Sequence, residues 1–211
     1  EVIVVDNNSK RHNPCDIQNN HPQVQFIANM TNVGFGRANN QAIALAKGDF
    51  ILVMNPDVIL ERTTLPELIT YLNRHPHVKI AAPKLLNHDG SVQHSCRTFP
   101  TPAVSIIKRT GLQLMKNSIA AYEMQDYDHE TPLKVDWASG ACLLLRGKQY
   151  FDDRYFLYFE DVDLCKSAGE VHYVPIARAT HLGQYASRTV STAFVHHTAS
   201  MIKYYAKWGW K

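Results

Sequence analysis

The residues best suited to chemistry lie in the segment 151–165, where acidic side chains are crowded among tyrosines and phenylalanines. The pair Glu160 and Asp161 stands within it. Apolar, aromatic surroundings disfavour the charged form of a carboxylate, so they move its pKa toward neutrality and suit a general base. An aspartate that caps a helix would explain one of these acids but not the cluster. The segment therefore predicts a proton-accepting site.

Asn55 and Asp57 form a polar turn directly after the apolar run 50–54. An aspartate at the tip of a buried strand can hold a hard divalent cation while that cation also binds a diphosphate, and the asparagine can supply a second polar contact. Aspartate is common in turns, so this turn taken alone favours an ordinary structural role.

Asp6, Asn7 and Asn8 end the first apolar run, 2–5, in the same way. Asp6 can accept hydrogen bonds from a nucleobase imide or a ribose hydroxyl. The alternative is an Asx turn that closes the strand, and the sequence leaves both open. If the two strands are neighbours, this turn lies beside the Asp57 turn.

Residues 32–40 form a glycine-flanked entry into a helix. Gly34 lets the backbone approach a ligand, and a helix N-terminus favours anions, so the segment can cradle a phosphate, with Gly34 and Asn39 as candidate residues that bind the nucleotide. The spacing is not GxGxxG and no P-loop lysine follows. The alternative is that Asn39 or Asn40 bonds to neighbouring backbone.

His181 ends an apolar-rich run that starts at Val171. A histidine at the end of a strand can complete a metal site or contact a diphosphate. The chain has 11 histidines, however, and a lone one is more often structural. We expect His196 and His197, in a predicted C-terminal helix, to face solvent.

The elements that position these residues alternate along the first half of the chain. This order predicts an α/β fold, a single domain with a mostly parallel central sheet flanked by helices. Ligands bind such sheets at the carboxyl ends of the strands, where Asp6 and Asp57 fall. We expect the loop-rich stretch 87–134 to shape a substrate pocket. The expected strands are the apolar runs 2–5, 24–28, 50–54, 78–86 and 135–147, and the expected helices are 37–47 and a segment capped by Thr63 or Thr64.

The composition of the 211 residues is that of one globular domain, with 45% hydrophobic and 19% charged residues. A net charge of +3 does not indicate a nucleic-acid partner. No acidic residue follows Glu170, which favours anionic neighbours or a solvated basic surface. Residues 193–211 predict either an amphipathic segment on an acidic membrane surface or a helix packed across the domain. The four widely spaced cysteines suit a reducing compartment, and no segment resembles a signal peptide or a membrane span.

Three classes of function fit these residues. An inverting glycosyltransferase needs a base for the acceptor hydroxyl and a cation for the departing nucleoside diphosphate, and the chain offers one base and no obvious covalent nucleophile. A metal-dependent nucleotidyltransferase or phosphohydrolase also needs strand-end carboxylates. A non-catalytic module that binds nucleotides or sugars is the third class.

Seven pieces of the sequence, taken in order, resemble the family 2 glycosyltransferases of the GT-A fold, and in particular their rhamnosyltransferase-like branch. Together they span nearly the whole chain from Glu1 to about His181. No single piece is decisive, but seven in the family order are very specific. The pieces are VVDNNS, NVGFGRANNQAI, FILVMNPDV, DGSVQHSCRTFP, VDWASGACLLLR, FDDRYFLYFEDVDLC and HYVPIARATH.

The resemblance implies a role for each candidate residue. Asp161 of the Glu160-Asp161 pair would be the catalytic base. The residues implied in binding the nucleotide and its cation are Asp6, Asn7, Asn8, Asn55, Asp57 and His181, with Asp57 and His181 holding Mg²⁺ or Mn²⁺. Those implied at the border of donor sugar and acceptor are Trp137, Ser139 and Gly140.

The resemblance also implies the substrates and the place of the reaction. The donor would be a dTDP- or UDP-sugar similar to dTDP-rhamnose, and the acceptor a saccharide, often lipid-linked, in a bacterial surface glycan. We expect residues 1–95 to bind the nucleotide sugar and residues 96–211, with a C-terminal helical tail, to bind the acceptor. The expected location is the cytoplasm, with peripheral contact at the inner face of the membrane.

The chain departs from the family pattern at three places. The family has one more strand before Val2, which helps to cradle the base, and more residues between Arg146 and Phe151 and between Cys165 and Gly169. A sheet without that strand would expose the backbone of its neighbours, so we expect these residues to belong to the natural protein.

Overall fold

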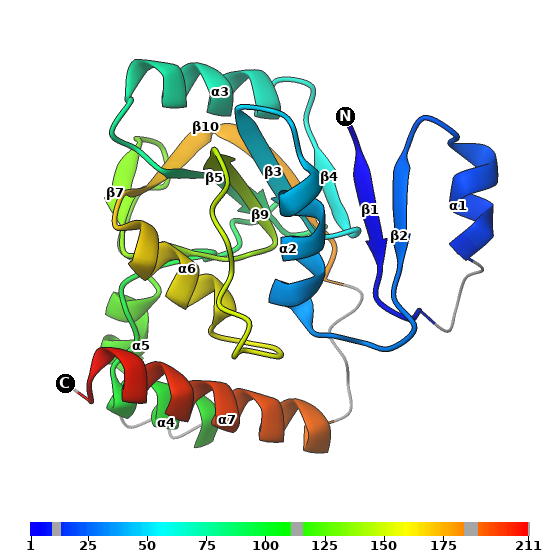
Figure 1. The fold of residues 1–211 in the computed structure, drawn as a ribbon. Helices are drawn as coiled ribbons and strands as arrows, with labels where there is room; N and C mark the ends of the chain where they lie inside the picture. Colours follow the sequence, from blue (N-terminus) through cyan, green and yellow to red (C-terminus); the bar gives the residue numbers. More distant parts are fainter. Residues whose placement is uncertain (10–13, 111–115, 184–189, 211) are drawn as a thin grey trace.

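The computed structural model, which describes residues 1–9, 14–110, 116–183 and 190–210, has a six-stranded sheet at its centre (Figure 1). Its strands are β3 (Phe50–Met54), β4 (Val58–Leu60), β5 (Ile80–Leu86), β7 (Leu133–Val135), β9 (Cys142–Arg146) and β10 (Val171–His181). Their order is β3-β9-β5-β10-β4, and β7 also pairs with β10. The expected α/β architecture is confirmed.

Helices cover both faces of this sheet. They are α2 (Phe35–Leu45), α3 (Thr64–Arg74) and α6 (Glu160–Ala168). Side chains alternate between the two faces of a strand, and those of β9 pack against helices on both faces of the sheet. Leu144 packs in one buried cluster with Leu68 and Leu72 of α3. Leu143 and Leu145 belong to another cluster that includes side chains of α2 and α6. The sheet is therefore buried on both sides, which explains its continuous apolar runs.

The sheet is mixed, and the expectation of a mostly parallel sheet is wrong in this respect. Only β5 and β10 run parallel within it, among the strands that the structure describes. Strand β9 lies between β3 and β5 and is antiparallel to both. The cause is the long stretch after β5, which returns the chain to the sheet in the opposite direction.

The first two strands form a separate sheet. Strand β1 (Ile3–Asp6) pairs in parallel with β2 (Gln25–Ala28), and α1 (Pro14–Asn20) connects them. Figure 1 shows this unit beside α2, apart from β3. Strands β1 and β3, which precede the Asp6 and Asp57 turns, therefore do not pair with each other. The arrangement in which these two strands are neighbours is not observed.

The C-terminal helix packs across the domain. It is α7 (Val190–Trp208), and it lies alongside α4 (Pro102–Thr110) in Figure 1, with α5 (Lys116–Tyr122) nearby. Tyr204 and Tyr205 are buried on its inner face, and the Tyr205 hydroxyl lies 2.7 Å from Ser105 Oγ. Phe194, Val195 and Ile202 of the same helix are exposed. In the described part of the chain, no helix combines the length and apolarity that crossing a bilayer requires.

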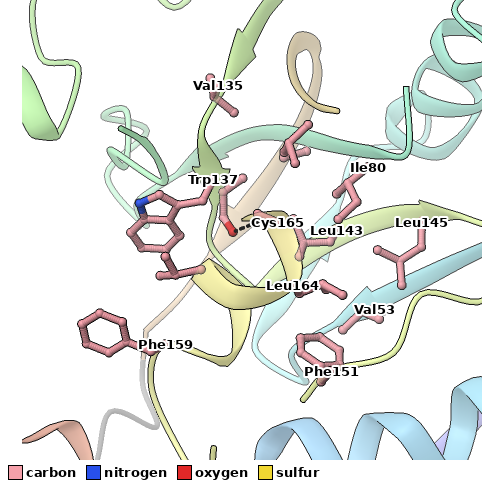
Figure 2. Close-up of a cluster of buried hydrophobic side chains, with 14 of the residues drawn as sticks. Val53, Ile80, Val135, Trp137, Leu143, Leu145, Phe151, Phe159, Leu164 and Cys165 are labelled. Carbon is pink, nitrogen blue, oxygen red and sulfur yellow. Dashed lines mark hydrogen bonds between the residues drawn. The ribbon is translucent and has the colours of Figure 1, made fainter. Parts of the chain in front are cut away.

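The core beneath α6 fixes that helix on the sheet (Figure 2). Leu164 and Cys165 are buried there with Leu143 and Phe151. The Cys165 thiol lies 3.8 Å from the carbonyl oxygen of Ala138, a weak hydrogen bond. That carbonyl belongs to β8 (Trp137–Ala138), which pairs with β6 (Cys96–Arg97). The middle of α6 is thus held against residues 137–138.

Candidate active site

The Glu160-Asp161 pair opens helix α6 after a turn in an unusual conformation. Tyr158 and Phe159 both have positive φ angles, 68° and 65°. A left-handed backbone costs a residue with a side chain about 1–3 kcal/mol, so it persists only where the surroundings fix it. Phe159 is buried, which supplies part of that fixation. The turn brings both carboxyl groups to the start of the helix.

Asp161 is held by backbone N–H groups on both oxygens. The Gly140 N–H donates to Oδ2 at 3.1 Å, and the Val162 N–H donates to Oδ1 at 2.9 Å. Burial raises the pKa of the Asp161 carboxyl, while these two hydrogen bonds and the charge of Arg97 oppose the rise. The carboxylate is thus oriented by the backbone and more basic than an ordinary aspartate.

Glu160 is only 6% exposed, and its Oε2 has no hydrogen-bond partner among the described residues. Burial, and then the charge of Asp161, raise the pKa of Glu160 well above the usual range for a carboxyl. Two adjacent carboxyls in a dry environment resist carrying two charges at once. A pair of this kind is able to take up and release a proton.

A cavity of about 600 Å³ opens beside this pair. Its wall combines apolar and aromatic side chains with a few polar groups, as in small-molecule sites. Trp137 and Ser139, which were predicted at the sugar site, line it together with Glu160 and Asp161. The other lining residues come mainly from α4 and α7 and from the turn before α6, and they include Val104, Lys108, Tyr122, Tyr158, Phe194 and His197.

Arg97 is a cavity residue that the sequence reasoning missed. Its guanidinium lies 5.0 Å from the centre of the Trp137 ring and 5.8 Å from that of Tyr122. Its buried Nε has no hydrogen-bond partner among the described residues. A cation stacked on aromatic rings and lacking a full set of acceptors suits an anionic ligand. An arginine within the loop-rich stretch 87–134 carries no sequence signal beyond its charge.

His196 and His197 do not face solvent as expected. His196 stacks on Phe156 with a ring-centre distance of 4.5 Å. His197 packs on Tyr158 and Phe159 and lines the cavity. The prediction failed because α7 packs these positions onto the turn before α6, a contact between segments distant in sequence.

Asp57 and His181 form the second polar centre, and strand pairing brings them together. Strands β4 and β10 are antiparallel with Val58 opposite His181. His181 Nε2 lies 3.4 Å from Asp57 Oδ1, and Gln93 Oε1 lies 2.9 Å from His181 Nδ1. A hydrogen bond from Nδ1–H to Gln93 leaves the Nε2 lone pair toward Asp57, the tautomer that a metal ligand needs. This donor set fits Mn²⁺ or Mg²⁺.

The two polar centres are attached to one short segment. The Gly140 N–H bonds to Asp161, and the Ala141 carbonyl accepts the Asn55 N–H at 2.9 Å. Added bulk at Gly140 would meet the Asp161 side chain at 3.3 Å. Residues 140–141 therefore separate the Asn55-Asp57 turn from the carboxyl pair, although Asp57 itself is not among the residues that line the cavity.

Most of the remaining residues that were predicted to bind the nucleotide sugar make contacts within the protein. Asp6 accepts the Ser9 N–H, which is the Asx-turn alternative. The Asn7 side chain holds the loop before α2, because it bonds to Asn32, to the Val33 N–H and to the Gly34 carbonyl. Asn8 is exposed with a φ of 63°. Asn39 Nδ2 bonds to the Phe35 carbonyl within its own helix.

Gly34 joins that loop to the turn before α6, which makes a stability prediction possible. Its φ is +93°, and an added Cβ would lie 2.5 Å from the Phe156 carbonyl oxygen. We expect Gly34→Ala to lower the free energy of unfolding by about 3 kcal/mol, from backbone strain and overpacking together. Gly90 has a φ of +82° with open space around it, so Gly90→Ala should cost only about 1 kcal/mol. Urea denaturation measures both, and equal losses would contradict the proposed clash.

Comparisons with known proteins identify the family to which the chain belongs. Residues 1–125 match the model of the family "Glycosyl transferase family 2". The chain is 31% identical over 193 residues to Rhamnosyltransferase WbbL of Escherichia coli, across 82% of this chain and 70% of that protein. It is 29% identical over 206 residues to the N-acetylglucosaminyl-diphospho-decaprenol L-rhamnosyltransferase of Mycobacterium tuberculosis, across 85% of this chain. The chain spans 66% of the length of that mycobacterial relative.

Solved structures share the fold at low sequence identity. The mannosyltransferase PcManGT of Pyrobaculum calidifontis, in complex with GDP-Man and Mn²⁺, matches 96% of this chain and 55% of its own, with a TM-score of 0.55 and 15% identity. GalNAc-T7, with UDP, GalNAc and Mn²⁺, matches 86% of this chain and 37% of its own, with a TM-score of 0.60 and 13% identity. With the family match and the rhamnosyltransferase relatives, these likenesses establish that the chain has the GT-A fold and belongs to glycosyltransferase family 2.

Proposed function

We propose that the chain carries the transferase site of an inverting glycosyltransferase that moves a rhamnose-like deoxyhexose or a hexose onto a saccharide. The observation that carries the proposal is the Glu160-Asp161 pair with its raised carboxyl pKa values at the edge of the cavity. In the proposed reaction Asp161 takes the proton of an acceptor hydroxyl. The resulting oxygen attacks the anomeric carbon of the donor, and the nucleoside diphosphate leaves from the opposite face.

The donor is proposed to be a dTDP- or UDP-sugar, bound mainly by residues up to about 95. Its diphosphate would lie at Asp57 and His181, whose facing Oδ1 and Nε2 atoms suit one divalent cation. When bound there, Mn²⁺ or Mg²⁺ supplies charge stabilisation for the leaving diphosphate. Asp57 is 8% exposed, so the charge of its carboxylate is poorly screened by solvent.

The acceptor is proposed to be a lipid-linked saccharide, bound mainly by residues from about 96 onward. The name of the mycobacterial relative specifies such an acceptor, a saccharide on a diphospho-decaprenol. In this chain Arg97, whose Nε has no partner among the described residues, places a cation in the cavity wall that suits a diphosphate, whereas the neighbouring Lys108 pairs with Glu123. Ile106 and Phe194, on α4 and α7, are 52% and 54% exposed and provide apolar surface for a lipid.

Calorimetry with UDP and dTDP, with and without Mn²⁺, tests the proposal. We expect Mn²⁺ to increase the affinity for at least one of the two nucleotides. In Asp57→Asn this increase should be at least about 10-fold smaller, because the variant loses an anionic ligand of the cation. Asp126→Asn is the matched control, since Asp126 is exposed and outside both polar centres.

The same protein, incubated with the intact nucleotide sugar and an acceptor, separates the classes of enzyme. A glycosyltransferase releases a nucleoside diphosphate from the nucleotide sugar, whereas a nucleotidyltransferase or a phosphohydrolase that cleaves its diphosphate releases sugar 1-phosphate. Binding that is indifferent to Mn²⁺ and to Asp57→Asn would contradict the assignment of the cation site.

A further inference from the structure

A second cluster of potential metal ligands lies at the far end of strand β10 from His181. Glu170 precedes this strand and His172 is its second residue, while His181 is its last. Eight residues separate the two histidines. His172 lies opposite Ala81 and Thr180 opposite Leu86 of β5, so the two histidines are roughly 20 Å apart. His77 reaches the cluster from the turn between α3 and β5, since β5 runs parallel to β10 and starts at the same edge.

The three side chains already face one another. One ligand atom each from His77, Glu170 and His172 lies within 4.8 Å of the other two. His172 Nε2 is 3.7 Å from Glu170 Oε2. The ring of His75 is 6.0 Å from that of His77 and 6.4 Å from that of His172, so a further imidazole borders the cluster.

Neighbouring groups orient the ligand atoms. The Tyr71 hydroxyl lies 2.8 Å from His172 Nδ1, and the Lys134 ammonium bonds to Glu170 Oε1 at 2.7 Å. These contacts occupy the outer nitrogen and the outer oxygen, and leave Nε2 and Oε2 turned toward each other. Metal-binding histidines and carboxylates are commonly fixed in this way by a partner on their second polar atom.

We propose that His77, Glu170 and His172 bind a transition-metal ion of the Zn²⁺ type, with His75 available as a fourth ligand. Two imidazoles and one carboxylate match zinc coordination, and this donor set is softer than the oxygen-rich sets that Mg²⁺ prefers. The ion joins the turn after α3 to the start of β10, two segments about 90 residues apart in the chain. It therefore stabilises the folded chain and takes no part in glycosyl transfer.

Zinc titration of the intact chain tests this site. We expect one tightly bound Zn²⁺ and a rise in Tm of about 5–10 °C when free Zn²⁺ is about 100 times Kd. His77→Gln should weaken zinc binding at least about 10-fold without harming the fold, because His77 is an exposed turn residue. His88→Gln, also exposed, is the control and should bind Zn²⁺ like the wild type.

Two further measurements locate the ion. Asp57→Asn should keep the zinc-induced rise in Tm, since Asp57 belongs to the other polar centre. Co²⁺ in place of Zn²⁺ should give visible d–d absorption bands that disappear in Glu170→Gln. Absence of zinc binding, or binding and Tm shifts unchanged in His77→Gln and Glu170→Gln, would overturn the assignment.

Discussion

Asp161→Asn is expected to lower kcat by about 10³- to 10⁴-fold while the affinity for the nucleotide stays within about twofold of wild type. Asparagine has the same shape and can still accept one of the two backbone hydrogen bonds that hold Asp161. It cannot accept the proton of the acceptor hydroxyl. Steady-state kinetics with a labelled donor gives kcat, and calorimetry gives the nucleotide Kd. Activity within about 10-fold of wild type would assign the base elsewhere.

Glu160→Gln provides the matched comparison, because it alters the neighbouring carboxyl and leaves Asp161 in place. The base works in its charged form, and burial raises the pKa of Asp161, so activity should increase as pH rises through that raised pKa. Burial and the charge of Asp161 raise the pKa of Glu160, so Glu160 is still neutral where Asp161 ionises. The acidic limb of the pH–rate profile should therefore stay within about half a pH unit of wild type in Glu160→Gln. A shift of that limb by about one unit or more would mean that Glu160 ionises first.

Asp163→Ala is expected to lower the free energy of unfolding by about 3 kcal/mol, because it breaks a buried charged network. Asp163 is 2% exposed. It accepts hydrogen bonds from Lys207 Nζ at 2.8 Å and from Trp208 Nε1 at 2.7 Å, and a weaker one from the Tyr155 hydroxyl. These bonds join α7 to α6, so their loss should loosen the C-terminal helix. Urea denaturation measures the change.

A control and a double-mutant cycle refine this prediction. Asp153 lies in the same acidic segment but is exposed, and its ion pair with Arg37 is 3.8 Å long. Asp153→Ala should therefore cost less than about 1 kcal/mol. In the cycle, Lys207→Met should cost less in the Asp163→Ala background than in the wild type, because the shared hydrogen bond is already absent. Full additivity would mean that the contact contributes nothing to stability.

Local sequence patterns predict much of this fold, since the apolar runs and the helix signals are local properties. The run at 50–54 coincides with β3, and the run at 2–5 is offset from β1 by one residue. Helix α2 ends at Leu45, two residues before the expected helix 37–47 does. The direction of β9 could not be predicted in this way. It depends on which strands pair after a long insertion, and apolar runs do not specify partners.

In the candidate site, too, local sequence patterns indicate some residues, whereas others are set by contacts between distant segments. The acidic-aromatic segment indicates Glu160 and Asp161 because neighbours in sequence create their environment. Arg97 and His197 reach the cavity through contacts of β6 and α7 with distant segments, so no local pattern identifies them. Asn7 is the opposite case, because its local pattern suggests ligand binding. In the structure, the side-chain amide of Asn7 instead holds the loop before α2.

Asn55 and Asp161 are both attached to residues 140–141, and this affects how the acceptor preference of such an enzyme can change in evolution. One side of the cavity wall comes from α4 and α7, whereas the two polar centres depend on the sheet and the start of α6. Substitutions on those two outer helices can change which acceptor fits while the spacing between the centres is preserved. New acceptor preferences can therefore arise by drift at the periphery without rebuilding the reaction chemistry.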